Sequence, residues 1–292
     1  MKRLLLATSA LIASATMANA QALTISGEGR MGIMYANNGV VNAWTQENRL
    51  TLNFNVAVEA DHGLSFGAWS SVRTQSIWTA WGGAYTGTFS GSRVWVEAGG
   101  ARLTFGNVDG AIATAGTSHG WLGGCMVGYE GGPICGDTAG LLLVAHQEVN
   151  PGAGSPSMAM VTYTAGDTVI AVSSQRGVST EVAAQTSFGA FTVAAGYSDI
   201  ATDVWTVSGH YDGGAWGAGA LVARMGGFTN WALSATADIA GGSMYGYFGR
   251  VLGFDAYGLS YGYDLGGGAT LTAGAERVSS LTMGSVGIAF SF

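Results

Sequence analysis

Arginine is the residue type whose positions most clearly suggest a chemical role. Lys2 is the only lysine of the 292-residue chain, so nearly all of its positive charge is carried by guanidinium groups. Five arginines lie at polar positions that alternate with apolar neighbours: Arg30, Arg49, Arg73, Arg93 and Arg102. Because guanidinium groups stay charged at any relevant pH and suit close clustering, we expect these five to form one continuous positively charged sector. The alternative is that they pair with acids of the same segments, which are Glu28, Glu59 and Glu97.

Two cysteines form the next candidate site. Cys125 and Cys135 are separated by nine residues within a glycine-rich segment. In an oxidising compartment a disulfide is the expected state of such a pair. A shared metal ion is the alternative, but no cluster of histidine or cysteine lies nearby to complete a set of four ligands.

The pattern of histidines and serines does not favour an enzyme. Neither a G-x-S-x-G nor an H-E-x-x-H motif occurs. The four histidines are scattered along the chain: His62, His119, His146 and His210. His146 with Glu148 could form a catalytic pair, but an ordinary loop histidine is the better interpretation. The sequence therefore predicts no catalytic residue and no metal site.

The N-terminus has the three parts of a secretory signal peptide. Lys2 and Arg3 precede an apolar run that ends at the small-residue site Ala18-Asn19-Ala20. The run is shorter than the ~20 residues that a spanning helix needs. We therefore predict a signal peptide over residues 1–20 and a mature chain over residues 21–292 that has left the cytoplasm.

The composition of the exported chain is unusually apolar. Hydrophobic residues make up 48% of the sequence and charged residues only 10%, whereas about 25% is typical of soluble domains. No uncharged apolar stretch after Ala20 reaches the ~18 residues of a transmembrane helix. Without Lys2 and Arg3 the 11 basic residues become nine, against 18 acids, and this negative balance argues against a nucleic-acid partner.

Apolar and polar residues alternate from Ala22 to the C-terminus. In "NRLTLNFNVAVE", for example, the apolar residues from Leu50 to Val58 alternate with polar ones. Such strands of about ten residues suit a tilted crossing of a bilayer. Seven short turns separate them, at 60–63, 99–100, 165–167, 189–190, 213–214, 241–243 and 266–268. Seven turns and eight opposite connections predict about 16 antiparallel strands.

One segment, residues 107–157, interrupts the alternation and follows the fifth predicted strand, "ARLTFG". Connections this long are usually functional or disordered. Apolar stretches such as "WLGGCMVGY" argue against disorder, so we expect the segment to pack against the rest of the molecule.

A closed barrel explains these features better than a soluble β-sandwich does. The polar face consists mostly of Ser, Thr, Asn and Gly, which suits a wet interior, while the apolar face suits lipid. Sixteen strands enclose an aqueous channel, and closure removes exposed strand edges. The fold class predicted is therefore an all-β transmembrane antiparallel barrel.

Four stretches carry a family resemblance: "ISGEGRMGIMY", "YTAGDTVIAVSS", "YGLSYGYDLGGGATLTAGAE" and "VGIAFSF". They resemble the general-diffusion porins of alphaproteobacteria, the Rhodobacter-type porins. The resemblance implies a trimeric barrel whose third external loop, residues 107–157, folds into the pore. It also implies that acids of this loop oppose the wall arginines; here these acids are Asp109, Glu130 and Asp137. The aromatic C-terminal strand, with Phe290 and Phe292 on the lipid side, resembles the signal that the outer-membrane assembly machinery recognises.

The function expected from the residues and the resemblance together is passive transport. We expect a non-enzymatic porin in the outer membrane of a Gram-negative bacterium, passing small hydrophilic solutes and ions through a homotrimer. The alternatives are a substrate-selective channel of the same fold and, less favoured, an outer-membrane barrel enzyme or adhesin. No cofactor is expected; calcium is compatible with the resemblance, but the sequence shows no clear site for it.

Overall fold

The computed structural model describes residues 22–37, 39–40, 42–76, 85–117, 158–200 and 202–292. The predicted signal peptide, residues 1–20, lies outside this range. The strands are β1 (Ala22–Asn37), β2 (Asn42–Glu59), β3 (Ser65–Gln75), β4 (Tyr85–Phe89), β5 (Arg93–Ala98), β6 (Ala101–Gly106), β7 (Met158–Ala165), β8 (Thr168–Gln175), β9 (Ser179–Phe188), β10 (Phe191–Ser198), β11 (Val204–Asp212), β12 (Trp216–Met225), β13 (Phe228–Ile239), β14 (Gly242–Val251), β15 (Phe254–Gly266), β16 (Ala269–Val278) and β17 (Leu281–Ser291). Two short helices accompany them, the 3-10 turn η1 (Asp61–Gly63) and α1 (Ala111–Ala115).

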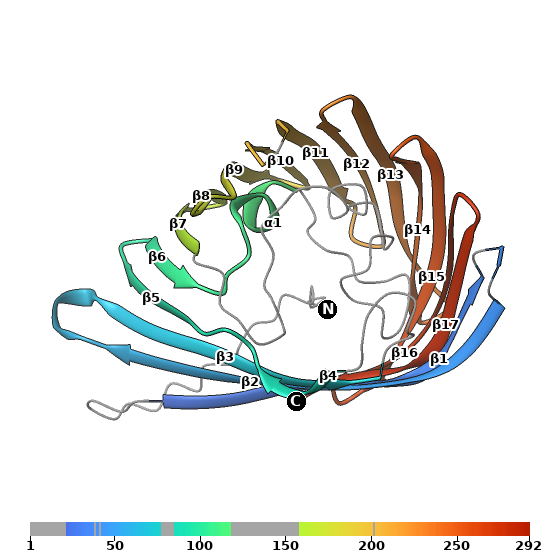
Figure 1. The fold of residues 1–292 in the computed structure, drawn as a ribbon, viewed down its shortest axis with the longest axis horizontal. Helices are drawn as coiled ribbons and strands as arrows, with labels where there is room; N and C mark the ends of the chain where they lie inside the picture. The colour runs from blue at the N-terminus through green and yellow to red at the C-terminus, as the bar shows by residue number, and fades with distance from the viewer. Residues whose placement is uncertain (1–21, 38, 41, 77–84, 118–157, 201) are drawn as a thin grey trace.

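The strands form one antiparallel sheet that closes into a barrel (Figure 1). Neighbouring strands are consecutive in the chain, and β17 pairs with β1 over ten residue pairs, from Glu28–Ser291 to Asn37–Thr282. Because β4 and β5 both pair with β3, they occupy a single position in the ring. The barrel therefore has the 16 strands that the turn count predicted.

The break between β4 and β5 is held by hydrogen bonds from two neighbouring segments. The Ser90 amide donates to the Ser71 carbonyl at 2.8 Å, and the Ser71 amide donates to Ser90 Oγ at 3.0 Å. Asn107 Nδ2 donates to the Gly91 carbonyl at 3.1 Å. These hydrogen bonds satisfy polar groups of the irregular residues 90–92, which lie beside the C-terminal end of β6.

All seven predicted turns are present, and they lie at the same end of the barrel as the C-terminus; we call this the turn end. Gly99 and Gly100 illustrate their chemistry, with φ of 55° and 82°, values that glycine adopts without steric cost. The opposite end, which carries the long connection between β6 and β7, is called the loop end. The loop end also has two-residue turns, between β12 and β13, β14 and β15, and β16 and β17, so the long β6–β7 connection is what marks it as the external end of a bacterial outer-membrane barrel.

The two faces of the sheet differ as the alternation predicted. Large apolar side chains on the outer face are exposed, among them Leu23, Ile25, Val286 and Phe292. Polar and small residues line the inner face. The first part of the β6–β7 connection also lies inside the ring, where α1 contacts β8, β9 and β10 (Figure 1).

Candidate functional site: the charged inner wall

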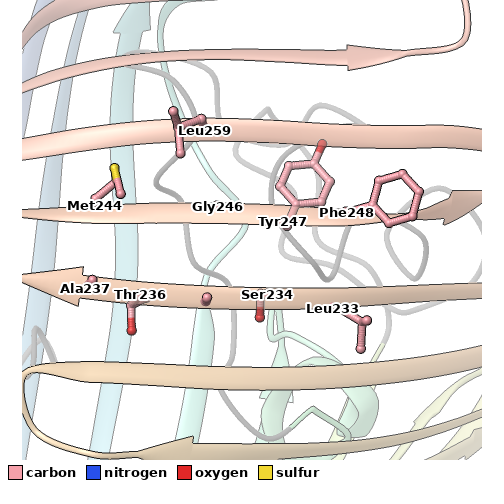
Figure 2. Close-up of a pocket in the computed structure, with 10 residues that line it drawn as sticks. Leu233, Ser234, Thr236, Ala237, Met244, Gly246, Tyr247, Phe248 and Leu259 are labelled. Carbon is pink, nitrogen blue, oxygen red and sulfur yellow. The ribbon is translucent and has the colours of Figure 1, made fainter.

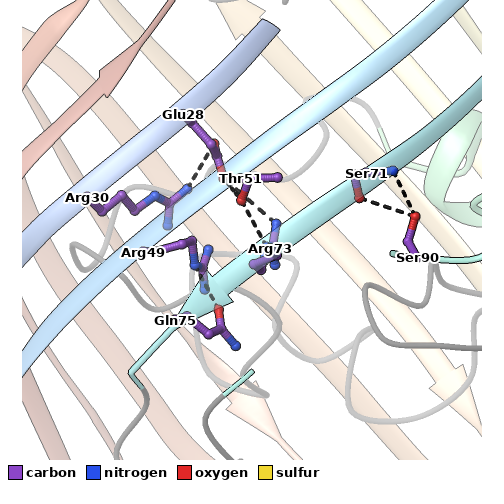
Figure 3. Close-up of polar contacts among 8 residues, drawn as sticks. All are labelled: Glu28, Arg30, Arg49, Thr51, Ser71, Arg73, Gln75 and Ser90. Atoms are coloured by element: carbon purple, nitrogen blue, oxygen red, sulfur yellow. Dashed lines mark hydrogen bonds and ion pairs between the residues drawn. The ribbon is translucent and has the colours of Figure 1, made fainter. Parts of the chain in front are cut away.

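Three neighbouring strands bring arginines together on the inner face (Figure 3). Arg30 on β1 lies opposite Arg49 on β2, and Arg49 lies opposite Gln75 on β3. Arg49 is only 3% exposed, and its Nε donates to Gln75 Oε1 at 2.9 Å. Because cross-strand neighbours on one face lie close together, the barrel register itself concentrates this positive charge.

A single carboxylate connects this arginine cluster. Glu28 lies 3.6 Å from Arg30 Nη2 and 3.7 Å from Arg73 Nη2. Thr51 Oγ1 stands between them, donating to Glu28 at 3.4 Å and accepting from Arg73 Nε at 3.0 Å. The predicted pairing with same-wall acids is therefore confirmed for Glu28. Two guanidinium groups share this carboxylate, which carries one negative charge against their two.

The remaining two predicted arginines stack on indole rings further along the same wall. The guanidinium carbon of Arg93 lies 4.2 Å from the centre of the Trp69 ring, and that of Arg102 lies 5.3 Å from Trp95. Arg102 also forms an ion pair with Glu97, its cross-strand neighbour near the turn end. Cation–π stacking fixes the planes of these guanidinium groups while their charge remains.

Glu59, the third acid proposed as a partner, lies at the turn end of β2. Among the described residues it forms no ion pair with the arginines. The five arginines lie on one continuous sector of inner wall, from β1 to β6, and their ion-pair partners among the described residues are Glu28 and Glu97.

Across the ring, α1 is anchored to the inner face of β8–β12 (Figure 1). The amide of Ala111 donates to Ser173 Oγ at 2.8 Å, and the amide of Ile112 donates to Glu181 Oε2 at 3.1 Å. Thr206 Oγ1 donates to the Gly116 carbonyl at 2.9 Å. These bonds satisfy polar groups at both ends of the helix. Without them these groups would have to bind water.

Apolar contacts complete the attachment of α1. Ile112 is buried against Leu221 and Ala223 of β12. Ala111 and Ala115 pack on the small residues Ala171 and Ala183. Small side chains on the wall let the helix backbone approach closely, and so the described part of the connection occupies space inside the barrel.

Asp109 is the one predicted loop acid within the described residues. It precedes α1 and lies near enough to Arg93 to interact with it electrostatically, because Gly106, three residues earlier, is the cross-strand neighbour of Arg93. Glu130, Asp137, Cys125 and Cys135 lie outside the described residues. The opposition of loop acids and wall arginines stays a prediction.

Sequence reasoning missed the residues that hold these charges in place. They are Gln75, Trp69 and Trp95 beside the arginines, and Ser173, Glu181 and Thr206 beneath α1. Alternation alone could have placed each of them on the inner face. Their partners depend on strand register and on the path of the β6–β7 connection, which alternation does not reveal.

The C-terminal aromatic residues lie on the outer face at the seam where the barrel closes. Phe292 and Gly27 exchange backbone hydrogen bonds of 2.8 and 3.0 Å. The Phe290 ring covers Gly29 so closely that a Cβ there would lie 2.3 Å from it, and the Phe292 ring covers Gly27 in the same way. The two rings are stacked, with centroids 6.3 Å apart.

Other chemistries find little support in the described part of the chain. No group of three or more His, Cys, Asp and Glu side chains there could hold a metal ion. No helix among the described residues is long and apolar enough to span a bilayer. The geometry instead combines an apolar outside, a charged inside and closure without edges, which defines a transmembrane β-barrel channel.

Comparison with known proteins identifies the family. The model of the Gram-negative porin family matches residues 7–281, and the chain belongs to this family. It is an outer-membrane porin, a channel and not an enzyme. No curated protein sequence matches the chain.

The fold is also that of solved porins. Three mutants of the porin from Rhodopseudomonas blastica superpose with TM-scores of 0.77, 0.78 and 0.78 at sequence identities of 18%, 19% and 20%. Each match covers 93% of this chain and 100% of the other. At such low identity the similarity concerns the architecture, and side-chain roles must be argued from this chain alone.

Proposed function

We propose that this porin is a general-diffusion channel whose narrowest part lies between the arginine wall and the inward-folded β6–β7 connection. The observation that carries the proposal is the placement of Arg30, Arg49 and Arg73 on the wall across the ring from α1. Solutes crossing the barrel pass between these two surfaces. A passage lined by water-exposed charges favours hydrophilic solutes and disfavours apolar ones.

Fixed charges of opposite sign on facing surfaces produce a field across the pore. The wall contributes Arg93 and Arg102 as well as the cluster on β1–β3, and the connection contributes Asp109. We propose that Glu130 and Asp137 add to the negative side. Since charges in a narrow, partly dry passage act more strongly than in bulk water, this field orients dipolar solutes as they pass.

The experiment that tests general diffusion is the swelling of liposomes containing the purified porin in sugars of increasing size. A general-diffusion channel gives rates that fall steadily with sugar size and rise in proportion to concentration. A rate that saturates with concentration for one sugar, or that favours it over smaller sugars, would instead establish the substrate-selective alternative. Protein-free liposomes provide the baseline.

We further propose that the porin acts as a homotrimer and reaches the membrane through the outer-membrane assembly machinery. The exposed apolar outer face and the stacked Phe290 and Phe292 support this proposal. A Cys125–Cys135 disulfide would restrain the β6–β7 connection, and removal of residues 1–20 would precede insertion. Passive diffusion requires no cofactor, and we propose none; calcium is compatible with the family resemblance but has no clear site in the sequence.

A further inference from the structure

Arginines on the outer face occur at one level of the barrel. Arg224, Arg250 and Arg277 are the penultimate residues of the alternate strands β12, β14 and β16, all at the loop end. Their neighbours of opposite parity point inward, as the contact of Leu221 and Ala223 with Ile112 shows for β12. The three arginines are exposed and face the surroundings of the barrel, unlike the five on the inner wall.

Each of these arginines has an aromatic cross-strand neighbour on the outer face. Trp205 lies opposite Arg224, Trp231 opposite Arg250 and Tyr257 opposite Arg277. Aromatic girdles mark the membrane–water interface of outer-membrane barrels. A charge at that depth costs little, whereas one at the bilayer midplane costs about 2–4 kcal/mol. The arginines therefore lie at the level of lipid head groups.

The guanidinium groups retain hydrogen-bonding capacity at this level. Arg250 donates from Nε and Nη2 to a single oxygen of Asp255, at 3.2 and 3.1 Å, and remains half exposed. Arg277 donates from Nε to the Ser279 carbonyl at 3.1 Å. A guanidinium has five N–H donors, so each of these arginines can still bind a phosphate with a pair of parallel bonds.

A groove in the outer face is lined by Phe248, which lies two residues before Arg250 on β14 (Figure 2). It has a volume of about 350 Å³ and is walled by Leu233, Phe248 and Leu259. Its floor contains Ala235 and Gly246, which are cross-strand neighbours. Along β14 the outer-face residues towards the membrane interior are Arg250, then Phe248, then Gly246. The positively charged residue at the strand end is therefore followed by apolar residues that line the groove.

We propose that this surface binds a lipopolysaccharide molecule of the outer leaflet. A lipid A phosphate would be bound by Arg250 and Arg277, and one of its acyl chains would lie over Ala235 and Gly246. The loop end of an outer-membrane barrel faces the cell exterior, and the leaflet on that side consists of this phosphorylated, multiply acylated glycolipid. Charge complementarity and an adjoining apolar groove are the two features that such a ligand needs. The inference rests on the membrane orientation and is independent of how the pore selects solutes.

The first test is native mass spectrometry of the full-length porin titrated with purified lipid A and, separately, with phosphatidylcholine. In the variant R250Q/R277Q we expect lipid A affinity to fall about tenfold or more, with little change for the zwitterionic lipid. The control R176Q removes an exposed loop-end arginine on the β8–β9 side and should bind lipid A like the wild type. Unchanged lipid A binding in R250Q/R277Q, or equal loss in R176Q, would overturn the proposal.

The groove has its own matched pair of variants. A235L fills the groove, whereas A195L places the same side chain on the outer face of β10. We expect A235L to weaken lipid A binding and A195L to leave it unchanged, both proteins being checked as folded by heat-dependent gel mobility. Equal binding in the two variants contradicts the acyl-chain site. If A235L instead abolishes a trimer that A195L retains, the face is a contact between copies of the chain and the lipid proposal is wrong.

Discussion

At the scale of single residues, the strand register places five arginines on one sector of the inner wall. Glu28 forms ion pairs with Arg30 and Arg73, and Arg49 donates a hydrogen bond to the neutral Gln75 side chain. Among the described residues of this wall the arginines outnumber the acids, although the whole chain has 18 acids against 11 basic residues. Local position, and not net charge, determines what a passing ion encounters.

Neutralising this wall should change ion selectivity. In the variant R49Q/R73Q/R93Q we expect the anion-to-cation permeability ratio to fall several-fold, because one unit charge acts on an ion at 4 Å with about 1 kcal/mol even in bulk water. The size limit for sugars should change little, since glutamine, although shorter than arginine, keeps a polar side chain at each position. Reversal potentials in a salt gradient across a planar bilayer measure the ratio.

The control for this variant is R224Q, which removes an arginine of the outer face. It should leave the reversal potential unchanged. If the luminal triple variant shows the same selectivity as the wild type, the arginines do not face the ion pathway.

Residue-scale predictions from the sequence succeeded where alternation alone decides the answer. Side chains of a strand alternate strictly between its faces, so the inward placement of all five arginines could be read from their neighbours. The partners of these arginines could not be read from the sequence. The approach of Arg73 to Glu28 depends on Thr51 standing opposite both in the β1–β2–β3 register, and the stacking on Trp69 and Trp95 depends on side-chain conformations that no periodicity encodes.

At the scale of elements, α1 is a short helix stabilised by its surroundings. An isolated helix of five residues is not stable in water, and α1 instead relies on buried Ile112 and on the bonds to Ser173, Glu181 and Thr206. The wall beneath it carries small residues that leave room for the backbone. Its position thus follows from β8–β12 more than from its own sequence, which explains why the sequence predicted packing of this segment but no helix.

Loosening α1 should widen or destabilise the passage. We expect I112A to destabilise the docked segment by about 2–5 kcal/mol, the usual cost of truncating a buried isoleucine to alanine. Larger open-channel current fluctuations and faster entry of large sugars would follow. Single-channel recording and liposome swelling measure these effects.

The matched control on the same helix is A113S, because Ala113 is exposed. It should behave like the wild type. Identical current noise and sugar entry for I112A and the wild type would mean that the α1 segment does not border the passage.

The seam between β1 and β17 is a second element whose chemistry is local. Gly29 faces lipid beneath the Phe290 ring, and we expect G29V to displace that ring and to lower the yield of folded barrel. G209V places the same side chain on an outer-face glycine of β11 that has no atom within 4 Å of its Cβ position, and it should fold normally. Heat-dependent gel mobility of outer-membrane fractions compares the two, and equal yields would contradict a role for the glycine–phenylalanine contact in closure.

At the scale of the whole molecule, the number and order of strands could be predicted because short glycine turns mark every second connection. Each turn fixes two strands as neighbours. An even number of strands with apolar residues on only one face of the sheet predicts closure into a barrel. The division of one barrel strand into β4 and β5 could not be predicted. It depends on Ser71 and Asn107, which bind the irregular residues 90–92 from other parts of the chain.

The single-channel conductance of the purified porin over a wide range of KCl concentrations shows whether the barrel is an open, water-filled channel. A water-filled channel between charged walls should give discrete current steps whose size rises in proportion to the bulk conductivity at high salt, with a relative excess at low salt where fixed charges concentrate counter-ions. Saturation of the conductance at moderate salt would indicate a binding site that ions must occupy in turn, and would contradict passive diffusion through an open, water-filled barrel.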